Sequence, residues 1–313
     1  MNQEIRTDLA LEVKERFQED NVEVKGVVLE EQEKADGKIR ISTVEITDRH
    51  GAQVMRKPIG RYVTLEMQTL LQIGSEEQEM LSSEVGEQLR QLLRHKSCSK
   101  VLVVGLGNRE VTPDSLGPRV ADQLLITRHL LREYGSGFLQ KNLSGMAGKK
   151  EVELSAVAPG VMAQTGMEAV EIVQGIVREI QPDLVIAIDA LAARSVARVT
   201  TTVQLTDTGI CPGAGIGNNR RALNEESIGC PVIAIGVPTV VDAATIVRDS
   251  MEQLLQEQGY SKREIELFLE SMDSMKGVDT MFVTPKSIDE AIGSVSEILA
   301  EGINQCFFFG SEA

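Results

Sequence analysis

The residues most able to do chemistry are aspartates placed at or just beyond the ends of apolar segments. The three candidates, with the apolar segment that each follows, are Asp114 after 101–104, Asp189 after 184–188 and Asp242 after 231–237. Two carboxyl groups that lie close together can share one proton, so that one acts as acid and the other as base on a water molecule. The carboxyl ends of parallel strands meet at one edge of a sheet, where ligands bind. The pattern therefore predicts a hydrolytic site built on Asp114 and Asp189.

Each aspartate also has a structural explanation. Asp114, in "TPDSLG", is equally compatible with a cap on the following helix, which is an ordinary use of Asp. Asp189 has a weaker structural explanation, because a buried carboxylate is costly unless it is partnered or functional. For Asp242 we favour the role of a helix N-cap over a role in the site.

Other reaction types fit the sequence less well. The turn "GLGNRE" resembles the start of a dinucleotide site, but Glu110 occupies the position of the third glycine, where pyrophosphate would approach. No GK[ST] phosphate loop and no G-x-S-x-G nucleophile motif occurs. The histidines are His50, His95 and His129, and none follows a buried strand. We therefore expect no Ser–His or Cys–His mechanism, no metal and no cofactor.

Composition narrows the class of partner. The chain has 313 residues, a formal net charge of −15 and 3% aromatic residues, which argues against a nucleic-acid-binding protein. No apolar run approaches the roughly 18 residues that a membrane-spanning helix needs, and the N-terminus lacks an apolar signal core. The four cysteines form no C-x-x-C pair, so we expect reduced thiols. These features favour a cytoplasmic protein that acts on a peptide, a protein or a small molecule.

The elements that must position the aspartates alternate between strand and helix. Apolar strands are predicted at 101–104, 151–157, 184–188 and 231–237, with an edge strand at 200–205. Helices are predicted at 75–96, 116–134, 166–180, 243–258, 261–272 and 285–302, the third opened by a Thr165–Glu168 capping box. Before them, two strands joined by an Asp36-Gly37 turn make residues from about 20 to 65 rich in β-structure. We expect a single α/β domain with a mostly parallel sheet flanked by helices and a β-rich N-terminal addition.

A glycine-rich loop over 207–220 is the remaining candidate feature. Together with Asn108, its residues Gly213, Gly215 and Gly217 are candidates for a backbone-lined groove that holds an extended peptide. A mobile surface connection explains the glycines equally well.

Five segments in order carry a resemblance to a known family. They are "VVGLGNREVTPDSLGPRV", "APGVMAQTGMEAVEIVQGIV", "PDLVIAIDALAARS", "DTGICPGAGIGNNR" and "PVIAIGVPTVVDA". Together they resemble the germination proteases of spore-forming bacteria. The resemblance implies an endopeptidase that degrades small acid-soluble spore proteins in the spore core, and a homotetramer. It also implies an atypical aspartic peptidase whose catalytic residues are Asp114 and Asp189.

The same resemblance implies a zymogen that processes itself. The family's processing site is an acidic residue, an apolar residue, Ala and, two positions later, Glu. Here "RTDLALEV" supplies Asp8, Leu9, Ala10 and Glu12. Residues 1–8 then form the prosegment, shorter than is usual in the family, and 9–313 the peptidase domain.

Two alternatives remain open at this point. The fold is also expected to be similar to hydrogenase-maturation endopeptidases, which makes a nickel-dependent peptidase the first alternative. A non-enzymatic oligomeric binding protein, with the aspartates serving as caps, is the second.

Overall fold

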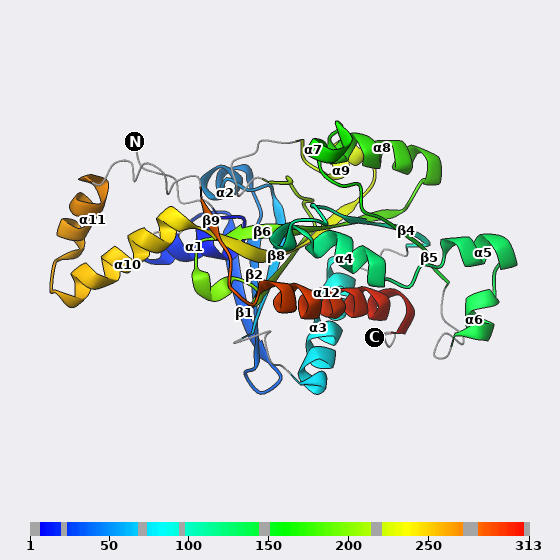
Figure 1. Ribbon diagram of the computed structural model, residues 1–313, viewed down its shortest axis with the longest axis horizontal. Coiled ribbons are helices and arrows are strands. Elements are labelled where there is room, and N and C mark those ends of the chain that lie inside the picture. The colour runs from blue at the N-terminus through cyan, green and yellow to red at the C-terminus, as the bar shows by residue number, and fades with distance from the viewer. Residues whose placement is uncertain are drawn as a thin grey trace.

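One mixed β-sheet runs through the molecule, and helices cover both of its faces (Figure 1). The structure, a computed structural model, describes residues 7–19, 24–67, 74–93, 98–143, 151–213, 221–271 and 281–309. Within these residues the strand order is β1-β2-β3-β7-β8-β6-β4-β5, with β9 paired to β8. The predicted α/β class, with a sheet flanked by helices, is confirmed.

The parallel part of the sheet consists of the strands that the sequence marks as apolar. They are β4 (Lys100–Gly105), β5 (Glu153–Val157), β6 (Leu184–Ala193) and β8 (Val232–Asp242). Both faces of this part are covered, which explains why the strands are apolar runs rather than alternating ones. Two of them are longer than predicted: β6 continues through Asp189, and β8 continues to Asp242.

The antiparallel part extends the same sheet and does not form a separate addition. Its strands are β1 (Val27–Lys34), β2 (Ile39–Ile46), β3 (Gly60–Met67) and β7 (Thr202–Thr206). The predicted Asp36-Gly37 turn joins β1 to β2, with φ of 55° and 82° at these two residues. β7 was expected at an edge, but it pairs with β3 on one side and β8 on the other, and all five of its residues are buried. Its alternating sequence places Gln204 and Thr206 on one face of the sheet, where both line a cavity.

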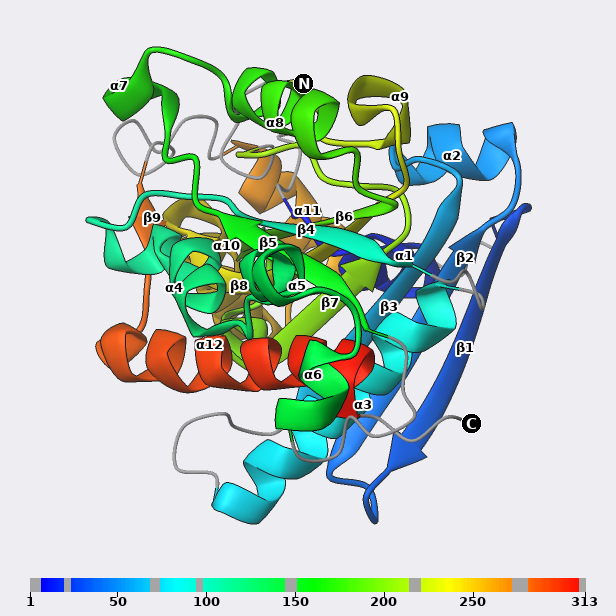
Figure 2. The same ribbon diagram turned by 90° about the vertical axis from the view of Figure 1, so that its right-hand side faces the viewer.

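Helices form a layer on each side of the sheet (Figures 1 and 2). One layer holds α3 (Ser75–Leu93), α4 (Leu116–Gln123) and α12 (Ile288–Asn304), which share the largest apolar core. The other layer holds α7 (Met162–Thr165), α8 (Ala169–Ile180) and α9 (Glu225–Ile228). Two further helices cover the N-terminal strands: α1 (Ala10–Glu19) and α2 (Arg49–Met55). The remaining elements are α5 (Arg128–Tyr134), α6 (Phe138–Asn142), α10 (Ala243–Glu257), α11 (Lys262–Ser271), β9 (Phe282–Val283) and the short η1 (Thr112–Asp114), η2 (Val196–Arg198) and η4 (Gln305–Phe309).

Two predicted helix details are wrong. The helix expected over 116–134 is broken between α4 and α5, because the Thr127 hydroxyl donates to the Val152 carbonyl and accepts the Leu154 N–H, tying this point of the chain to β5. The capping box expected at Thr165 does not open α8. That helix begins after Glu168, whose N–H donates to the Glu171 carboxylate at 3.0 Å.

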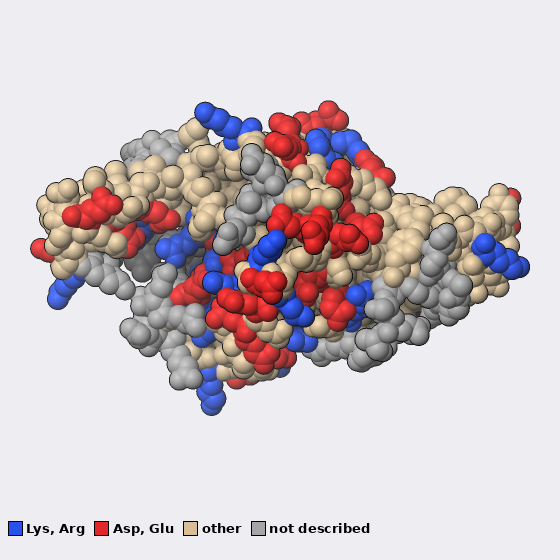
Figure 3. Space-filling view, turned by 90° about the horizontal axis from the view of Figure 1, so that it is seen from below, with Lys and Arg blue, Asp and Glu red and all other residues tan. Residues whose placement is uncertain are grey.

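The surface reflects the acidic composition. On the face shown in Figure 3, carboxylates gather over the middle of the molecule, with basic side chains scattered between them. Among the described residues, no helix is long and apolar enough to span a membrane.

Candidate active site

Asp189 lies inside β6, in register with Gly236 of β8. Because side chains alternate along a strand, Asp189 projects from the face opposite to its neighbour Ile188, which packs in the main core. The Asp189 side chain is 5% exposed, and its Oδ1 accepts the Ala190 N–H at 3.0 Å. A buried carboxylate thus occupies the middle of the sheet, near the point where β4 ends.

Asp114 is positioned by the turn that follows β4. Its Oδ2 accepts the Asn108 N–H at 2.7 Å. Gly107 passes so close that a Cβ there would lie 2.0 Å from the Asp114 carbonyl oxygen, and its φ of 113° is one that other residues rarely adopt. The glycine-containing turn therefore holds the aspartate, and this close approach explains why glycine is needed.

Contacts between the turn and β6 bring the two aspartates to the same region. The Leu106 N–H donates to the Ile188 carbonyl at 2.8 Å, immediately before Asp189. The η1 turn that ends at Asp114 packs against both β6 and β8. Asp114 thus lies beyond the end of β4, and Asp189 lies within the neighbouring parallel strand β6, next to the point where β4 ends.

The predicted groove residues are only partly described. The Asn108 side chain accepts from the Glu110 N–H at 3.0 Å and from Gln164 Nε2 at 2.8 Å, so it fixes the turn that carries Asp114. Gly213 has a left-handed φ of 71°. Gly215 and Gly217 lie outside the described residues.

The N-terminal segment pairs with the end of β6, a contact that the sequence does not predict. The Asp8 N–H donates to the Ala192 carbonyl at 3.0 Å, and the Asp8 carboxylate accepts the Ala192 N–H at 2.9 Å. Leu9 is fully buried among apolar side chains, which are Leu191, Ala193, Val199 and Val241. The Asp8–Leu9 peptide bond is therefore seated on the strand that carries Asp189.

Glu12 also binds the N-terminal segment to the rest of the fold. Its side chain is 2% exposed and accepts the backbone N–H groups of Arg194 at 2.8 Å and Ser195 at 3.0 Å. The Arg198 guanidinium, 3.6 Å from Glu12, also pairs with Glu15 at 2.6 Å and with Glu66 at 2.7 Å. Burial lowers the pKa of Arg198, but Glu15 and Glu66 together outweigh this effect and raise it above its usual value.

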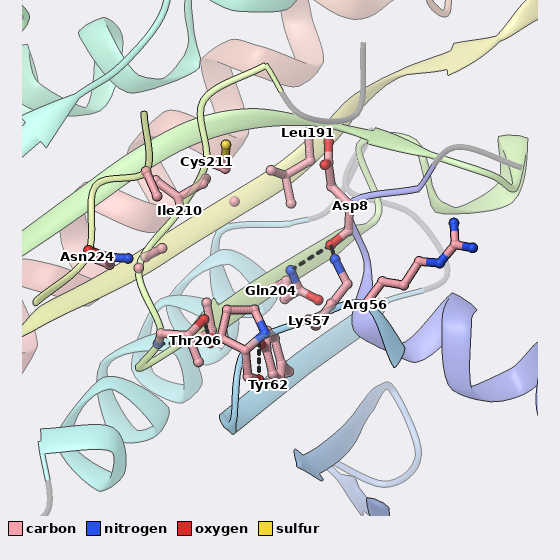
Figure 4. A pocket seen from close by; sticks show the side chains of 16 residues that line it. Asp8, Arg56, Lys57, Tyr62, Leu191, Gln204, Thr206, Ile210, Cys211 and Asn224 are labelled. Carbon is pink, nitrogen blue, oxygen red and sulfur yellow. Dashed lines mark hydrogen bonds between the residues drawn. The ribbon is translucent and has the colours of Figure 1, made fainter. Parts of the chain in front are cut away.

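A cavity of about 200 Å³ lies beside the Asp8–Leu9 bond (Figure 4). Its walls include Asp8, Lys57 and Gln204, and Gly236, the register partner of Asp189, also lines it. The first residues of the glycine-rich loop, Thr208 to Cys211, complete one side. Nothing in the sequence singles out Lys57 or Gln204, because neither belongs to a motif or follows an apolar strand.

The two histidines that the structure describes lie in helices. His50 is in α2 and His129 in α5, while His95 lies outside the described residues. Within the part of the chain that the structure describes, no group of three or more His, Cys, Asp or Glu side chains could hold a metal ion.

Asp242 is an N-cap, as the sequence indicates. Its Oδ1 accepts from the Ala244 N–H at 2.8 Å and from the Thr245 N–H at 3.4 Å, at the start of α10. Asp242→Ala should therefore destabilise the protein by about 1 kcal/mol, measured by urea unfolding, while peptide hydrolysis keeps its rate. A rate loss as large as that of an aspartate in the site would instead place Asp242 in the reaction.

A family described as germination protease matches residues 4–276. A germination protease of Clostridium perfringens (strain SM101) is 42% identical, over 96% of this chain and 94% of the relative. The Bacillus subtilis germination protease is 38% identical, over 96% and 92%. The solved [NiFe] hydrogenase maturation protease HycI of Thermococcus kodakarensis matches with a TM-score of 0.34 and 16% identity, over 69% of this chain and 99% of the other.

The matches cover most of the chain and define its class: the protein is a peptidase. Within that class, the chain belongs to the germination protease family.

Proposed function

We propose that this protein is an endopeptidase that uses Asp114 and Asp189 to activate water, and that it is made as a zymogen which cuts its own Asp8–Leu9 bond. Its proposed substrates are small acid-soluble spore proteins, degraded in the spore core at germination. The proposed active assembly is a homotetramer.

One observation carries the mechanism. Asp189 is a buried carboxylate in the middle of a sheet, and the turn that holds Asp114 is hydrogen-bonded to the residue before it. Burial of a carboxylate carries a free-energy cost that a purely structural role seldom requires, and such groups cluster at functional sites. Two carboxyl groups, one within β6 and one in the turn after β4, would supply the acid and the base that hydrolysis of a peptide needs.

The zymogen proposal is supported by the way residues 8–12 are bound. Asp8, Leu9 and Glu12, the acidic, apolar and Glu positions of the processing pattern, each have their own partners in the fold. Asp8 is bound to β6 three residues beyond Asp189, so the candidate bond lies on the same strand as the proposed catalytic group.

Self-cleavage provides the test. The purified full-length protein should convert to a form that begins at Leu9, identified by mass spectrometry, and should cut a peptide containing Thr-Glu-Ile-Ala-Ser-Glu between Glu and Ile. Mild acid, near pH 5.5, should speed the reaction, because a catalytic pair works with one proton between the two carboxyls.

The control is the Asp189→Asn protein incubated alone. If it produces the same Leu9 terminus, a contaminating peptidase made the cut. A wild-type product that starts at any other residue removes Asp8–Leu9 as the processing site.

A further inference from the structure

The carbonyl oxygen of Asp8 is bound by two side-chain donors. Lys57 Nζ donates to it at 2.9 Å and Gln204 Nε2 at 3.3 Å (Figure 4). Lys57 follows α2 and Gln204 lies in β7, so elements far apart in the chain converge on one peptide group. Two N–H donors aimed at one carbonyl oxygen are the arrangement that stabilises the negative charge which develops there during acyl transfer.

Gln204 also binds the backbone on the C-terminal side of Leu9. Its Oε1 accepts the Ala10 N–H at 2.8 Å while its Nε2 donates to the Asp8 carbonyl. The side-chain amide of Gln204 therefore binds the backbone on both sides of Leu9, at the Asp8 carbonyl and at the Ala10 N–H. With the Leu9 side chain fully buried, this clamp fixes the orientation of the bond.

The sheet register places this clamp in a row with Asp189. Gly236 of β8 is the register partner of Asp189 on one side and of Gln204 on the other, so all three project from the same face. Neighbouring strands are about 4.8 Å apart, which puts β6 and β7 about 10 Å apart. Gly236 has no side chain, and the Leu191 side chain of β6 packs over it, since a Cβ at Gly236 would lie 2.5 Å from Leu191 Cδ1. Gly236 and Leu191 both line the cavity beside Asp8.

The charge of Lys57 suits it to this position. Burial lowers the pKa of Lys57, and the carboxylates of Asp8 and Glu12 raise it by a smaller amount. This lowering favours the neutral amine, but when protonated the Lys57 ammonium interacts more strongly with a developing negative charge than a lysine on the surface would.

We propose that Lys57 and Gln204 form the oxyanion-binding pair for cleavage of the Asp8–Leu9 bond; this rests on the proposed self-processing. Water gives one proton to an aspartate and adds to the Asp8 carbonyl carbon, and the carbonyl oxygen becomes an oxyanion bound by Lys57 and Gln204. The carbon–nitrogen bond then breaks, the Leu9 nitrogen receives a proton from the aspartate pair, and Asp8 leaves with a new carboxyl group.

The test is the first-order rate of self-cleavage in variants of the full chain. Lys57→Met should slow the cut by about 10²–10³-fold, the loss expected for one oxyanion donor, and Gln204→Met should slow it by about tenfold because its hydrogen bond is longer and uncharged. Lys57→Arg, which keeps a charged donor, should recover part of the loss. Lys38→Met removes a lysine charge from the surface, where Lys38 pairs with Glu77, and should cut at the wild-type rate.

A second measurement separates catalysis from simple anchoring. In the Asp189→Asn background, which keeps the segment intact, hydrogen exchange at the Asp8 and Ala10 amides reports whether the segment stays bound. We expect Lys57→Met to leave the protection of these amides within about tenfold of that in the parent. Full loss of protection would make Lys57 an anchor and overturn the proposal.

The remaining outcomes are also decisive. Self-cleavage of Lys57→Met at the wild-type rate overturns the proposal while leaving the aspartate mechanism intact. If Lys57→Met does not fold, the cleavage rates of Gln204→Met and Lys57→Arg test the proposal instead. Cleavage by Gln204→Met at the wild-type rate would count against the oxyanion-binding pair. If the wild-type protein makes no Leu9 terminus, the proposed function fails, and this failure is distinct because it precedes any variant.

Discussion

Replacing Asp189 with Asn should lower the rate of peptide hydrolysis by about 10²–10⁴-fold and leave the fold intact. Asn has the shape of Asp and still accepts the Ala190 N–H, but it can neither take a proton from water nor hold one for the leaving nitrogen. Asp114→Asn should have an effect of the same order, since its amide oxygen still accepts the Asn108 N–H. Both losses should appear in kcat, measured on the Thr-Glu-Ile-Ala-Ser-Glu peptide with protein that begins at Leu9.

A matched control lies at the opposite end of β6. Asp183 precedes the strand, is exposed, and accepts the backbone N–H groups of Ser99 and Lys100 at 2.7 and 2.9 Å. Asp183→Asn removes a charge from the same strand without touching the proposed site, and it should keep the wild-type kcat. Near wild-type hydrolysis by both Asp189→Asn and Asp114→Asn would contradict the aspartate mechanism.

The sequence predicts the parallel half of the sheet well because its strands are buried on both faces. Continuous apolar runs with turn residues between them leave few other structures for segments such as 184–188. The same reasoning places the end of this strand too early, because it treats the first polar residue after an apolar run as the strand boundary. Asp189 lies within β6, in register with Gly236 of β8, and Asp242 ends β8 by capping α10.

Contacts between distant segments account for what sequence reasoning missed. The position of β7 depends on pairing with β3, more than a hundred positions earlier in the chain, as well as with β8, and local alternation does not encode a partner. The same is true of the hydrogen bonds between Asp8 and Ala192, and of those that Lys57 and Gln204 donate to the Asp8 carbonyl. Asp114 and Asp189 can be proposed from sequence because the end of an apolar run is a local property, and such ends tend to share one edge of a parallel sheet.

Gly117→Ala should cause the largest loss of stability among these variants. Gly117 lies at the start of α4, where a Cβ would meet the Leu106 carbonyl oxygen at 2.3 Å and the Ile188 carbonyl oxygen at 2.6 Å. Both are backbone atoms, in the turn that leads to Asp114 and in the residue before Asp189, and neither can move without parting β4 from β6. Overpacking of a close-packed core costs about 1–3 kcal/mol, and we expect about 3 kcal/mol here because the overlap is with backbone.

This substitution should also affect catalysis, because it pushes apart the two segments that carry the aspartates. At a temperature where the variant remains folded, its kcat should fall by about 10²-fold, as expected when catalytic groups are displaced by about 1 Å. Gly175→Ala is the matched control: it lies inside α8, and a Cβ there would have no atom within 4 Å. It should stabilise the protein by about 0.5–1 kcal/mol through the helix preference of Ala over Gly and keep the wild-type rate. Thermal melting and peptide hydrolysis measured on both variants provide the comparison. If Gly117→Ala matched Gly175→Ala in both stability and rate, the close packing of α4 on the two strand ends would not be what holds Asp114 and Asp189 together.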